Sequence, residues 1–550
     1  MTQIVGHQIA GALADFGVRT IFGVISIHNM PILDAIAEQG RIRFVPARGE
    51  AGAMNMADAY SRVSGEVGVV LTSTGTAAGN AAGAQAEALS AGSKLVHITT
   101  QIDRPFMDRD RAAIHDVPKQ PTMLAGLSKA VFRIWDEKSV IGTLEAAMRA
   151  ALTPPSGPVS LEIPIDVQHL PAVASPPARP PKPALPPVDA EAIEALAGLV
   201  MKARRPMLWL GGGARHAGAE ALALMERGFG AVTSTQGRAI VPETHAATLG
   251  AFNMTPQARE IYSQCDLMIV VGSRLRGNET QNNKMQLPAP LVQIDAEPTQ
   301  AGRNYPVDLF LCSDAAQTLA ALLEKLPDRL DVDPQMAHEI AIARAQSEGV
   351  LRAGLGPYQE LADHLLSVVP AGRHPWVRDI TISNSTFGNR YVQIAAPHLG
   401  VHALGGGIGQ GIAMAIGAAL ANPGSRAIAL LGDGGAQLGM AELITAVDEG
   451  LDITYILMND AAYGVIENIQ DAQYGGRRHY SKLKTPDFAK LCAAVDMPHS
   501  KVSAIEDFAA IFDQSLSVRG PALVEVDMVA IGPFATAFAG PPAGAAGGAK

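Results

Sequence analysis

Two segments in the C-terminal third of the chain combine glycine with acidic residues at the ends of apolar runs. Gly432-Asp433-Gly434-Gly435 ends one run, and Asp460 ends the next. Parallel strands joined by a helix end at the same edge of their sheet, so both carboxylates can approach one divalent cation. Glycine turns let backbone N–H groups approach a phosphate, and carboxylate and phosphate oxygens suit Mg²⁺ or Ca²⁺ rather than zinc. The two segments therefore predict a joint metal and phosphate site.

A further acidic residue of interest lies far upstream, in RGEAGAMNMADAYSRVSG (48–65). Glu50 stands at the predicted start of a helix that directly follows a predicted strand. A carboxylate at this position ordinarily stabilises the helix by its favourable interaction with the helix dipole. Its importance here comes from the pattern around it.

Together, the Glu50 segment, the GDG turn and the Asn-Asp pair at 459–460 resemble the cofactor motifs of thiamine-diphosphate-dependent enzymes. The chain resembles the decarboxylase and acetolactate-synthase group, which includes benzoylformate decarboxylase and benzaldehyde lyase. The likeness spans essentially the whole chain. It implies an α/β fold of three doubly wound parallel-sheet domains: a pyrimidine-binding domain, a Rossmann-like middle domain and a diphosphate-binding domain.

The resemblance also implies the cofactor contacts. Asp433 and Asp460 would bind Mg²⁺ (or Ca²⁺) through their side chains and Ala462 through its carbonyl, although many relatives carry Asn in place of Asp460. Ile408 falls where a large apolar residue lies under the bent thiamine diphosphate. The implied contacts to the organic cofactor are Asn80, Ser385, Thr386, Ile408, Gly434, Gly435, Tyr463 and Gly464.

Three residues are implied as catalytic acids and bases. Glu50 would protonate the aminopyrimidine ring, which requires the raised pKa that burial gives a carboxyl. His28 matches a histidine of benzaldehyde lyase, and His115 falls where that enzyme and acetolactate synthase carry a glutamine. Both histidines are expected to move protons on substrate and product. Further pocket candidates are Ser73, His402, Val465 and Ile469.

Some positions depart from these relatives. Benzoylformate decarboxylase has a histidine at the place of Ser73 and a serine at that of Ile27. A plain aromatic 2-oxo-acid decarboxylase is therefore not favoured. Acetolactate synthase has no equivalent of His28, so that assignment is also imperfect.

The expected activity is that of a C–C lyase or carboligase acting on a small 2-oxo acid or 2-hydroxy ketone through an enamine–thiazolium intermediate. Acetolactate-synthase-like and aldehyde-lyase-like reactions both remain open. One alternative is an FAD-containing, pyruvate-oxidase-like oxidoreductase, for which Gly211-Gly212-Gly213 and Gly272 are weak evidence. Another is a non-catalytic, cofactor-binding regulatory subunit. By resemblance, a homodimer is the smallest assembly, because the first domain of one chain faces the third domain of another, and a homotetramer is expected.

Alternating apolar runs and helical periodicity predict the parallel sheets that must position these residues. Predicted strands include 20–24, 67–73, 426–434 and 453–460, as well as 382–385, and a helix is expected from about Ala441. The expected order is a pyrimidine-binding domain at 1–170, a Pro-rich linker at 171–188, a middle domain at 189–330, a helical connection at 331–356, a diphosphate-binding domain at 357–535 and a disordered tail at 536–550.

The amino-acid composition argues against several other classes of protein. Of 550 residues, 48% are apolar and 17% charged, as in globular proteins with large cores. A net charge of −10 without a long basic run argues against nucleic-acid binding. The cysteines are too few and too distant for a disulfide framework, and no secretory signal is visible, so a cytoplasmic location is expected. Residues 404–421 are uncharged, but their glycines predict a buried helix rather than a membrane span.

Overall fold

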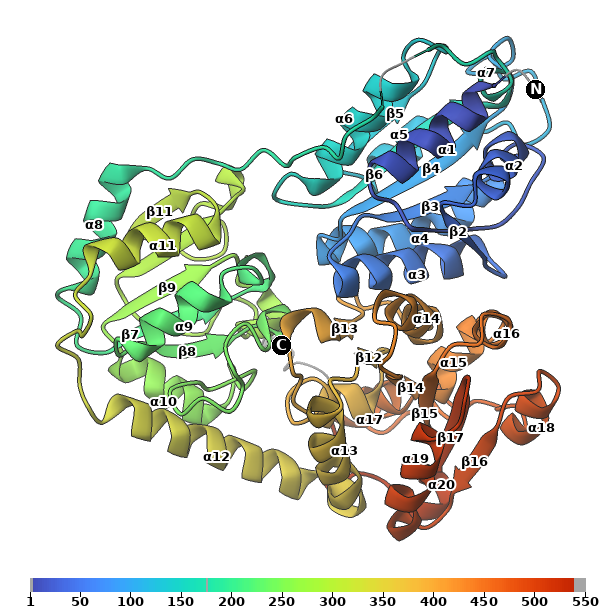
Figure 1. The fold of residues 1–550 in the computed structure, drawn as a ribbon. Helices are drawn as coiled ribbons and strands as arrows, with labels where there is room; N and C mark the ends of the chain where they lie inside the picture. Colours follow the sequence, from blue (N-terminus) through green and yellow to red (C-terminus); the bar gives the residue numbers. More distant parts are fainter. Residues whose placement is uncertain (1–2, 175–176, 539–550) are drawn as a thin grey trace.

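The computed structural model describes residues 3–174 and 177–538, and within these ranges the strands form three separate parallel sheets (Figure 1). Helices cover both faces of each sheet, so the expected α/β fold class is confirmed. The ends of the chain and two positions of the predicted linker, residues 1–2, 175–176 and 539–550, lie outside the described part.

The first sheet has the strand order β2-β1-β3-β4-β6-β5. Neighbouring residues on a strand face opposite sides, and here both sides are apolar: Ile21 joins the core under α1 and α6, whereas Phe22 joins the core under α3 and α4. The strands are β1 (Thr20–Gly23), β2 (Arg43–Pro46), β3 (Gly68–Thr72), β4 (Leu95–Gln101), β5 (Ala130–Arg133) and β6 (Pro158–Pro164). The helices are α1 (Val5–Asp15), α2 (Met30–Gln39), α3 (Glu50–Ser64), α4 (Thr76–Ala91), α5 (Gln120–Ala125), α6 (Val140–Leu152) and α7 (Ile165–Gln168).

The second sheet has the order β11-β10-β9-β7-β8. One face packs against α8, α9 and α11, and the other against α10 and α12. Helix α12 then leads to the third sheet along the edge of the molecule (Figure 1). The elements are α8 (Ala190–Val200), β7 (Pro206–Leu210), α9 (Gly218–Glu226), β8 (Gly230–Thr233), α10 (Pro256–Gln264), β9 (Leu267–Val271), β10 (Leu291–Asp295), β11 (Leu309–Cys312), α11 (Ala315–Lys325) and α12 (Met336–Gly354).

The third sheet has the order β13-β12-β14-β15-β17-β16, so β14 and β15 are neighbours near its centre. Its strands are β12 (Trp376–Arg378), β13 (Gly400–His402), β14 (Ala427–Gly432), β15 (Ile453–Asn459), β16 (His499–Val502) and β17 (Ala522–Asp527). Its helices are α13 (Gln359–Ala371), α14 (Gly411–Ala421), α15 (Asp433–Gly439), α16 (Glu442–Asp448), α17 (Gly464–Gln473), α18 (Phe488–Ala493), α19 (Phe508–Leu516) and α20 (Met528–Ile531).

One local prediction in the third unit is wrong. Residues 382–385 are helical rather than extended, because the Thr381 hydroxyl accepts hydrogen bonds from the backbone N–H groups of Ser383 (2.9 Å) and Asn384 (3.2 Å) and starts a helical turn. Strand β12, just before this turn, lies in the sheet between β13 and β14, where residues 382–385 were expected to contribute a strand. The helix expected from about Ala441 is confirmed as α16, which begins at Glu442, and a further short helix, α15, begins at Asp433.

Within residues 404–421, only Gly411–Ala421 is helical, as α14, and this helix packs against α3 of the first unit (Figure 1). The two helices approach so closely that a Cβ added to Gly417 would lie 2.0 Å from the carbonyl oxygen of Met56. The first and third units therefore share one hydrophobic core. No helix in the described residues is long and apolar enough to cross a membrane.

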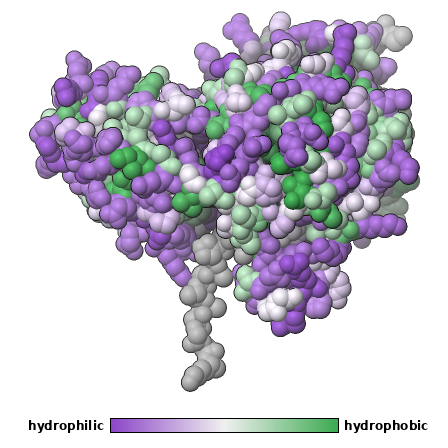
Figure 2. Space-filling model, turned by 90° about the horizontal axis from the view of Figure 1, so that it is seen from below, coloured by the Kyte–Doolittle hydropathy of each residue, from purple (hydrophilic) through white to green (hydrophobic). Residues whose placement is uncertain are grey.

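The start of the expected disordered tail is bonded to the folded chain. Thr536 donates its N–H to the Gly354 carbonyl at 3.0 Å, and the Phe538 carbonyl accepts from Asn468 Nδ2 at 3.0 Å. The face of the molecule shown in Figure 2 is mostly hydrophilic, with small separate hydrophobic patches.

The contact between α3 and α14 predicts opposite effects of two glycine-to-alanine substitutions. Gly417→Ala should destabilise the protein by about 1–3 kcal/mol, because the added methyl group must push the helices apart. Gly83→Ala, in α4, meets no atom within 4 Å and should stabilise it by about 0.5–1 kcal/mol through helix propensity. Unfolding by denaturant measures both, and equal shifts would contradict the close contact.

Candidate active site

The two acidic residues predicted to bind metal lie side by side. Asp433 is the first residue of α15, directly after β14, and Asp460 directly follows β15, the neighbouring strand. Asp433 is buried, and its Oδ2 atom has no hydrogen-bond partner among the described residues. Asp460 Oδ1 accepts a long hydrogen bond of 3.2 Å from the N–H of Ala462.

The electrostatics of this pair suit a divalent cation. Burial and the adjacent charge of Asp460 raise the pKa of Asp433 to about 7, and burial also raises the pKa of Asp460. Two buried carboxylates that repel each other are stabilised by a positive charge between them. Their hard oxygen atoms are the ligands that Mg²⁺ and Ca²⁺ prefer.

The turn after Asp460 closes around the pair. A Cβ added to Gly464 would lie 2.3 Å from Asp460 Oδ2, and one added to Gly434 would lie 2.5 Å from the Tyr463 ring. The structure thus brings together Gly434, Gly464 and Tyr463, and it buries Ala462 in the same turn. The pocket candidates Val465 and Ile469 are half-buried on α17, which begins at Gly464.

The loop that carries Ile408 is fixed by an acidic residue that the sequence analysis missed. Asp379, which follows β12, accepts hydrogen bonds from the N–H groups of Gly409 (3.1 Å), Gly411 (3.1 Å) and Ile380 (2.7 Å). Burial raises its pKa to about 6. Ile408 itself remains 37% exposed. The available signal was an acidic residue two positions after the apolar pair Trp376-Val377, at the end of a strand as Asp433 is.

Ser385 and Thr386 lie on the π-helix Asn384–Gly388. Thr386 Oγ1 donates back to its own helix, to the carbonyl of Ile382 or Ser383 at 3.0 Å. His402, at the end of β13, places its Nδ1 atom 3.3 Å from Asn384 Nδ2. Burial holds the pKa of His402 well below its usual value, so the ring is neutral. His402 therefore lies beside the predicted diphosphate contacts.

In the first unit, the structure joins Glu50 and Asn80, which were predicted separately. Glu50 is the first residue of α3 and Asn80 lies in α4, and Asn80 Nδ2 donates to Glu50 Oε2 at 3.1 Å. The amide thus orients the carboxyl group and leaves Oε1 available for another partner.

The two predicted histidines also meet. The rings of His28 and His115 pack edge to face with centroids 5.1 Å apart. His28 is buried, its Nδ1 has no hydrogen-bond partner within the described part of the chain, and burial together with His115 lowers its pKa. His115 is exposed on a loop and has a left-handed φ of 67°, and its carbonyl abuts Gly75. Ser73, two residues before Gly75, has a buried hydroxyl without a partner in the described residues.

Comparison with known proteins agrees with this arrangement. Residues 4–123 match the thiamine pyrophosphate enzyme N-terminal TPP binding domain, residues 193–322 its central domain and residues 382–526 its C-terminal TPP binding domain. The chain belongs to the thiamine pyrophosphate enzyme family. Together with the relatives below, the matches identify an enzyme of the decarboxylase and acetolactate-synthase type.

Among the relatives of this thiamine pyrophosphate enzyme is a protein of Pseudomonas aeruginosa named "Probable 2-ketoarginine decarboxylase". It is 30% identical over 96% of this chain and 94% of the relative. An acetolactate synthase isozyme 3 large subunit of Escherichia coli is 27% identical over 96% of this chain and 94% of its own length. A "Probable acetolactate synthase large subunit" of Methanocaldococcus jannaschii is 25% identical over 94% and 91%, respectively.

The glycines that suggested a flavin in the middle domain have another role in this family member. A Cβ added to Gly211 would lie 2.3 Å from the Gly272 carbonyl oxygen, and one added to Gly213 would lie 2.8 Å from the Gly272 Cα. These glycines let two backbone turns touch, so they do not indicate a flavin site.

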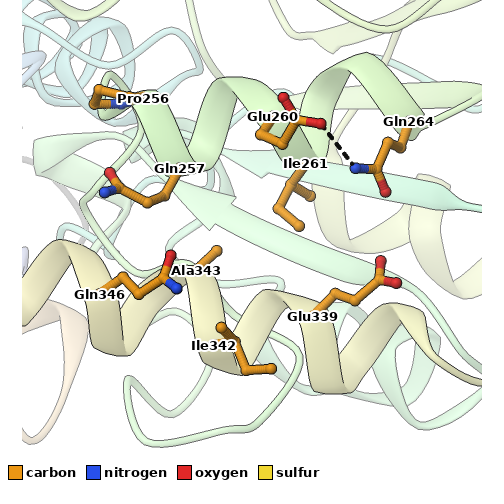
Figure 3. A pocket seen from close by; sticks show the side chains of 9 residues that line it. All are labelled: Pro256, Gln257, Glu260, Ile261, Gln264, Glu339, Ile342, Ala343 and Gln346. Atoms are coloured by element: carbon orange, nitrogen blue, oxygen red, sulfur yellow. Dashed lines mark hydrogen bonds between the residues drawn. The ribbon is translucent and has the colours of Figure 1, made fainter.

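A groove of about 410 Å³ lies in the same domain between α10 and α12 (Figure 3). The apolar side chains of Ile261, Ile342 and Ala343 lie between the two helices, and Gln264 donates to Glu260 at the rim. Its lining contains none of the residues predicted to bind cofactor or substrate.

The carboxylate pair predicts unequal effects of two asparagine substitutions. Asp433→Asn should weaken Mg²⁺-dependent thiamine diphosphate binding more than about tenfold, because it removes a charged ligand. Asp460→Asn should weaken it less, because by resemblance many relatives carry Asn at this position, so an uncharged oxygen donor suffices there. Calorimetric titration measures both affinities. Neither variant should lower the thermal midpoint of the cofactor-free protein, since each removes a buried charge, and equal affinities for both variants and the wild type would refute the assignment.

The contact between the two histidine rings predicts that a substitution of one will change the pKa of the other. His115→Gln should raise the pKa of His28, because it removes one of the two causes that lower it. NMR titration of histidine-labelled protein measures this pKa. An unchanged value would mean that the two rings do not interact in solution.

Proposed function

We propose that the protein uses thiamine diphosphate and Mg²⁺ to decarboxylate a small 2-oxo acid, and that it releases the product as an aldehyde or joins it to a second carbonyl compound. The observation that carries the cofactor assignment is the buried Asp433–Asp460 pair. A 2-oxo acid as donor is supported by the relatives named as a decarboxylase and as acetolactate synthases. The proposal includes no flavin.

The third unit would hold the cofactor by its phosphates. Asp433, Asp460 and the carbonyl of Ala462 would ligate Mg²⁺. The first-turn N–H groups of Gly434 and Gly435 would bind diphosphate oxygens, together with Ser385 and Thr386. When bound, thiamine diphosphate supplies a nucleophilic carbon that adds to the substrate carbonyl and accepts the electron pair released with CO₂.

Glu50 would act as the acid that activates the cofactor. Asn80 occupies its Oε2 atom, which leaves Oε1 to exchange a proton with the aminopyrimidine nitrogen. A family member whose first domain faces the third domain of another chain needs a partner chain to complete this site. We therefore propose a homodimer as the smallest active unit, a homotetramer as the full assembly and the cytoplasm as its location.

His28 and His115 would handle the protons of the substrate. Neutral His28 can accept a proton from a substrate hydroxyl group, and exposed His115 can exchange it with solvent. Ile408, Val465 and Ile469 would form apolar walls that exclude water, and Ser73 and His402 would border the pocket.

The same feature of His28 favours a second candidate function. Cleavage of a 2-hydroxy ketone into two aldehydes begins with removal of the hydroxyl proton, for which a neutral imidazole is suited. In that case the donor loses an aldehyde instead of CO₂.

The test is CO₂ release from a panel of 2-oxo acids in the presence of thiamine diphosphate and Mg²⁺, with Glu50→Gln as the control variant. At least one acid should release CO₂, and Glu50→Gln should reduce the rate at least about 100-fold, the usual contribution of a positioned acid. Hydroxy ketones in the same mixtures would distinguish ligation from simple decarboxylation.

A different outcome would favour the second function. If protein shown to bind the cofactor releases no CO₂ from any acid but cleaves 2-hydroxy ketones, the decarboxylase proposal is wrong. Unchanged activity of Glu50→Gln would refute the role of Glu50 in either reaction.

A further inference from the structure

We infer that two buried glutamates, Glu87 and Glu442, form a reciprocal clamp that holds the proposed cofactor residues in place. Each glutamate belongs to one cofactor-binding unit and binds backbone N–H groups of the other. Glu87 holds the loop that carries Ile408, and Glu442 holds the backbone directly before Glu50. The clamp rests on the proposed roles of Glu50 and Ile408, and both glutamates are positioning residues.

Glu87 extends from α4 of the first unit to the third. Its carboxylate accepts hydrogen bonds from the N–H groups of Leu404 and Gly405, the latter at 2.6 Å. Glu87 is 2% exposed, and it lies near Arg62, whose Nη1 donates to the His402 carbonyl at 2.6 Å. The carboxylate therefore fixes one end of the loop, and Asp379 fixes the other end through Gly409 and Gly411.

Glu442 extends from α16 of the third unit to the first. Its carboxylate accepts hydrogen bonds from the N–H groups of Arg48 and Gly49, each at 3.1 Å. Glu442 is 4% exposed, and Thr445 Oγ1 donates to its second oxygen at 2.7 Å. These contacts fix the backbone at the start of α3, whose first residue is Glu50.

Glycines allow both glutamate side chains to come close to the backbone of the other unit. A Cβ added to Gly52 would lie 2.0 Å from Glu442 Oε1, and one added to Gly405 would lie 2.7 Å from Glu87 Oε2. Because Glu442 is buried, its side chain has little space into which to retreat.

Burying a carboxylate is unfavourable unless strong donors bind both oxygens. A carboxylate that accepts two N–H groups gains charge-assisted hydrogen bonds. In Glu87→Gln the amide would turn a donor towards an N–H donor, and in Glu442→Gln the bonds from Arg48 and Gly49 would lose their charge assistance. The replacement of either glutamate by glutamine should therefore loosen the bound backbone with little change in volume.

The first test measures amide hydrogen exchange in the cofactor-free protein. Glu87→Gln should accelerate exchange at Leu404 and Gly405 at least about tenfold, and Glu442→Gln should do so at Arg48 and Gly49. The matched control is Glu449→Gln, because Glu449 also crosses between the units but pairs with the side chain of Arg43 rather than with backbone. The control should leave exchange at all four amides unchanged.

The second test separates the two halves of the clamp. Glu87→Gln should weaken thiamine diphosphate binding about tenfold, because it frees the loop of Ile408. Glu442→Gln should lower kcat about tenfold at saturating cofactor, because it displaces Glu50. Gly52→Ala, which should otherwise favour the helix, is expected to reproduce the effect of Glu442→Gln on kcat and thus guards against a folding defect of that variant.

The outcomes distinguish this inference from the proposed function. Unchanged amide exchange in both glutamine variants would overturn the clamp, whatever the enzyme catalyses. Accelerated exchange together with the affinity and kcat effects supports it, whereas accelerated exchange with affinity and kcat equal to those of Glu449→Gln would overturn the positioning role. Failure of the wild-type protein to bind thiamine diphosphate would instead refute the proposed function.

Discussion

The close contact between α3 and α14 is the constraint on which the proposed site depends. The two helices belong to different sheets, and Gly417 allows α14 to approach the backbone of α3 at Met56. Their side chains form one hydrophobic core with both sheets. Only at this distance can a carboxylate of one unit reach the backbone of the other, as Glu87 and Glu442 do.

Two kinds of buried carboxylate lie near the proposed cofactor site. Asp379 and Glu442 accept hydrogen bonds from backbone N–H groups, which offset part of the cost of burying their charge. Asp433 and Asp460 lie next to each other instead, and Asp433 Oδ2 has no hydrogen-bond partner among the described residues. Because a buried charge without donors is costly, this difference distinguishes the residues that organise the fold from those suited to a cation.

Sequence reasoning succeeded where the relevant pattern is local. The long apolar runs that became β14 and β15 predicted both their ends and the meeting of Asp433 and Asp460. It failed at short strands such as β12, where the apolar run is too brief to stand out and the neighbouring residues 382–385 were chosen instead. It also missed Glu87, Asp379 and Glu442, because each binds the backbone of a residue remote in sequence or follows an unrecognised strand. One signal was present: Glu87 is the single charged residue in the sequence of α4.

The proposed cofactor residues and the proposed substrate residues lie in different structural surroundings. The proposed cofactor residues lie at strand ends and helix starts, which buried carboxylates hold across a shared core. The proposed substrate residues His28 and His115 lie on loops, and His115 adopts a left-handed conformation that its neighbours must impose. Loops can change residues without disturbing a core, whereas the clamped backbone cannot. The same cofactor frame can thus serve relatives named for different reactions, and the residues around His28 are where differences in substrate should arise.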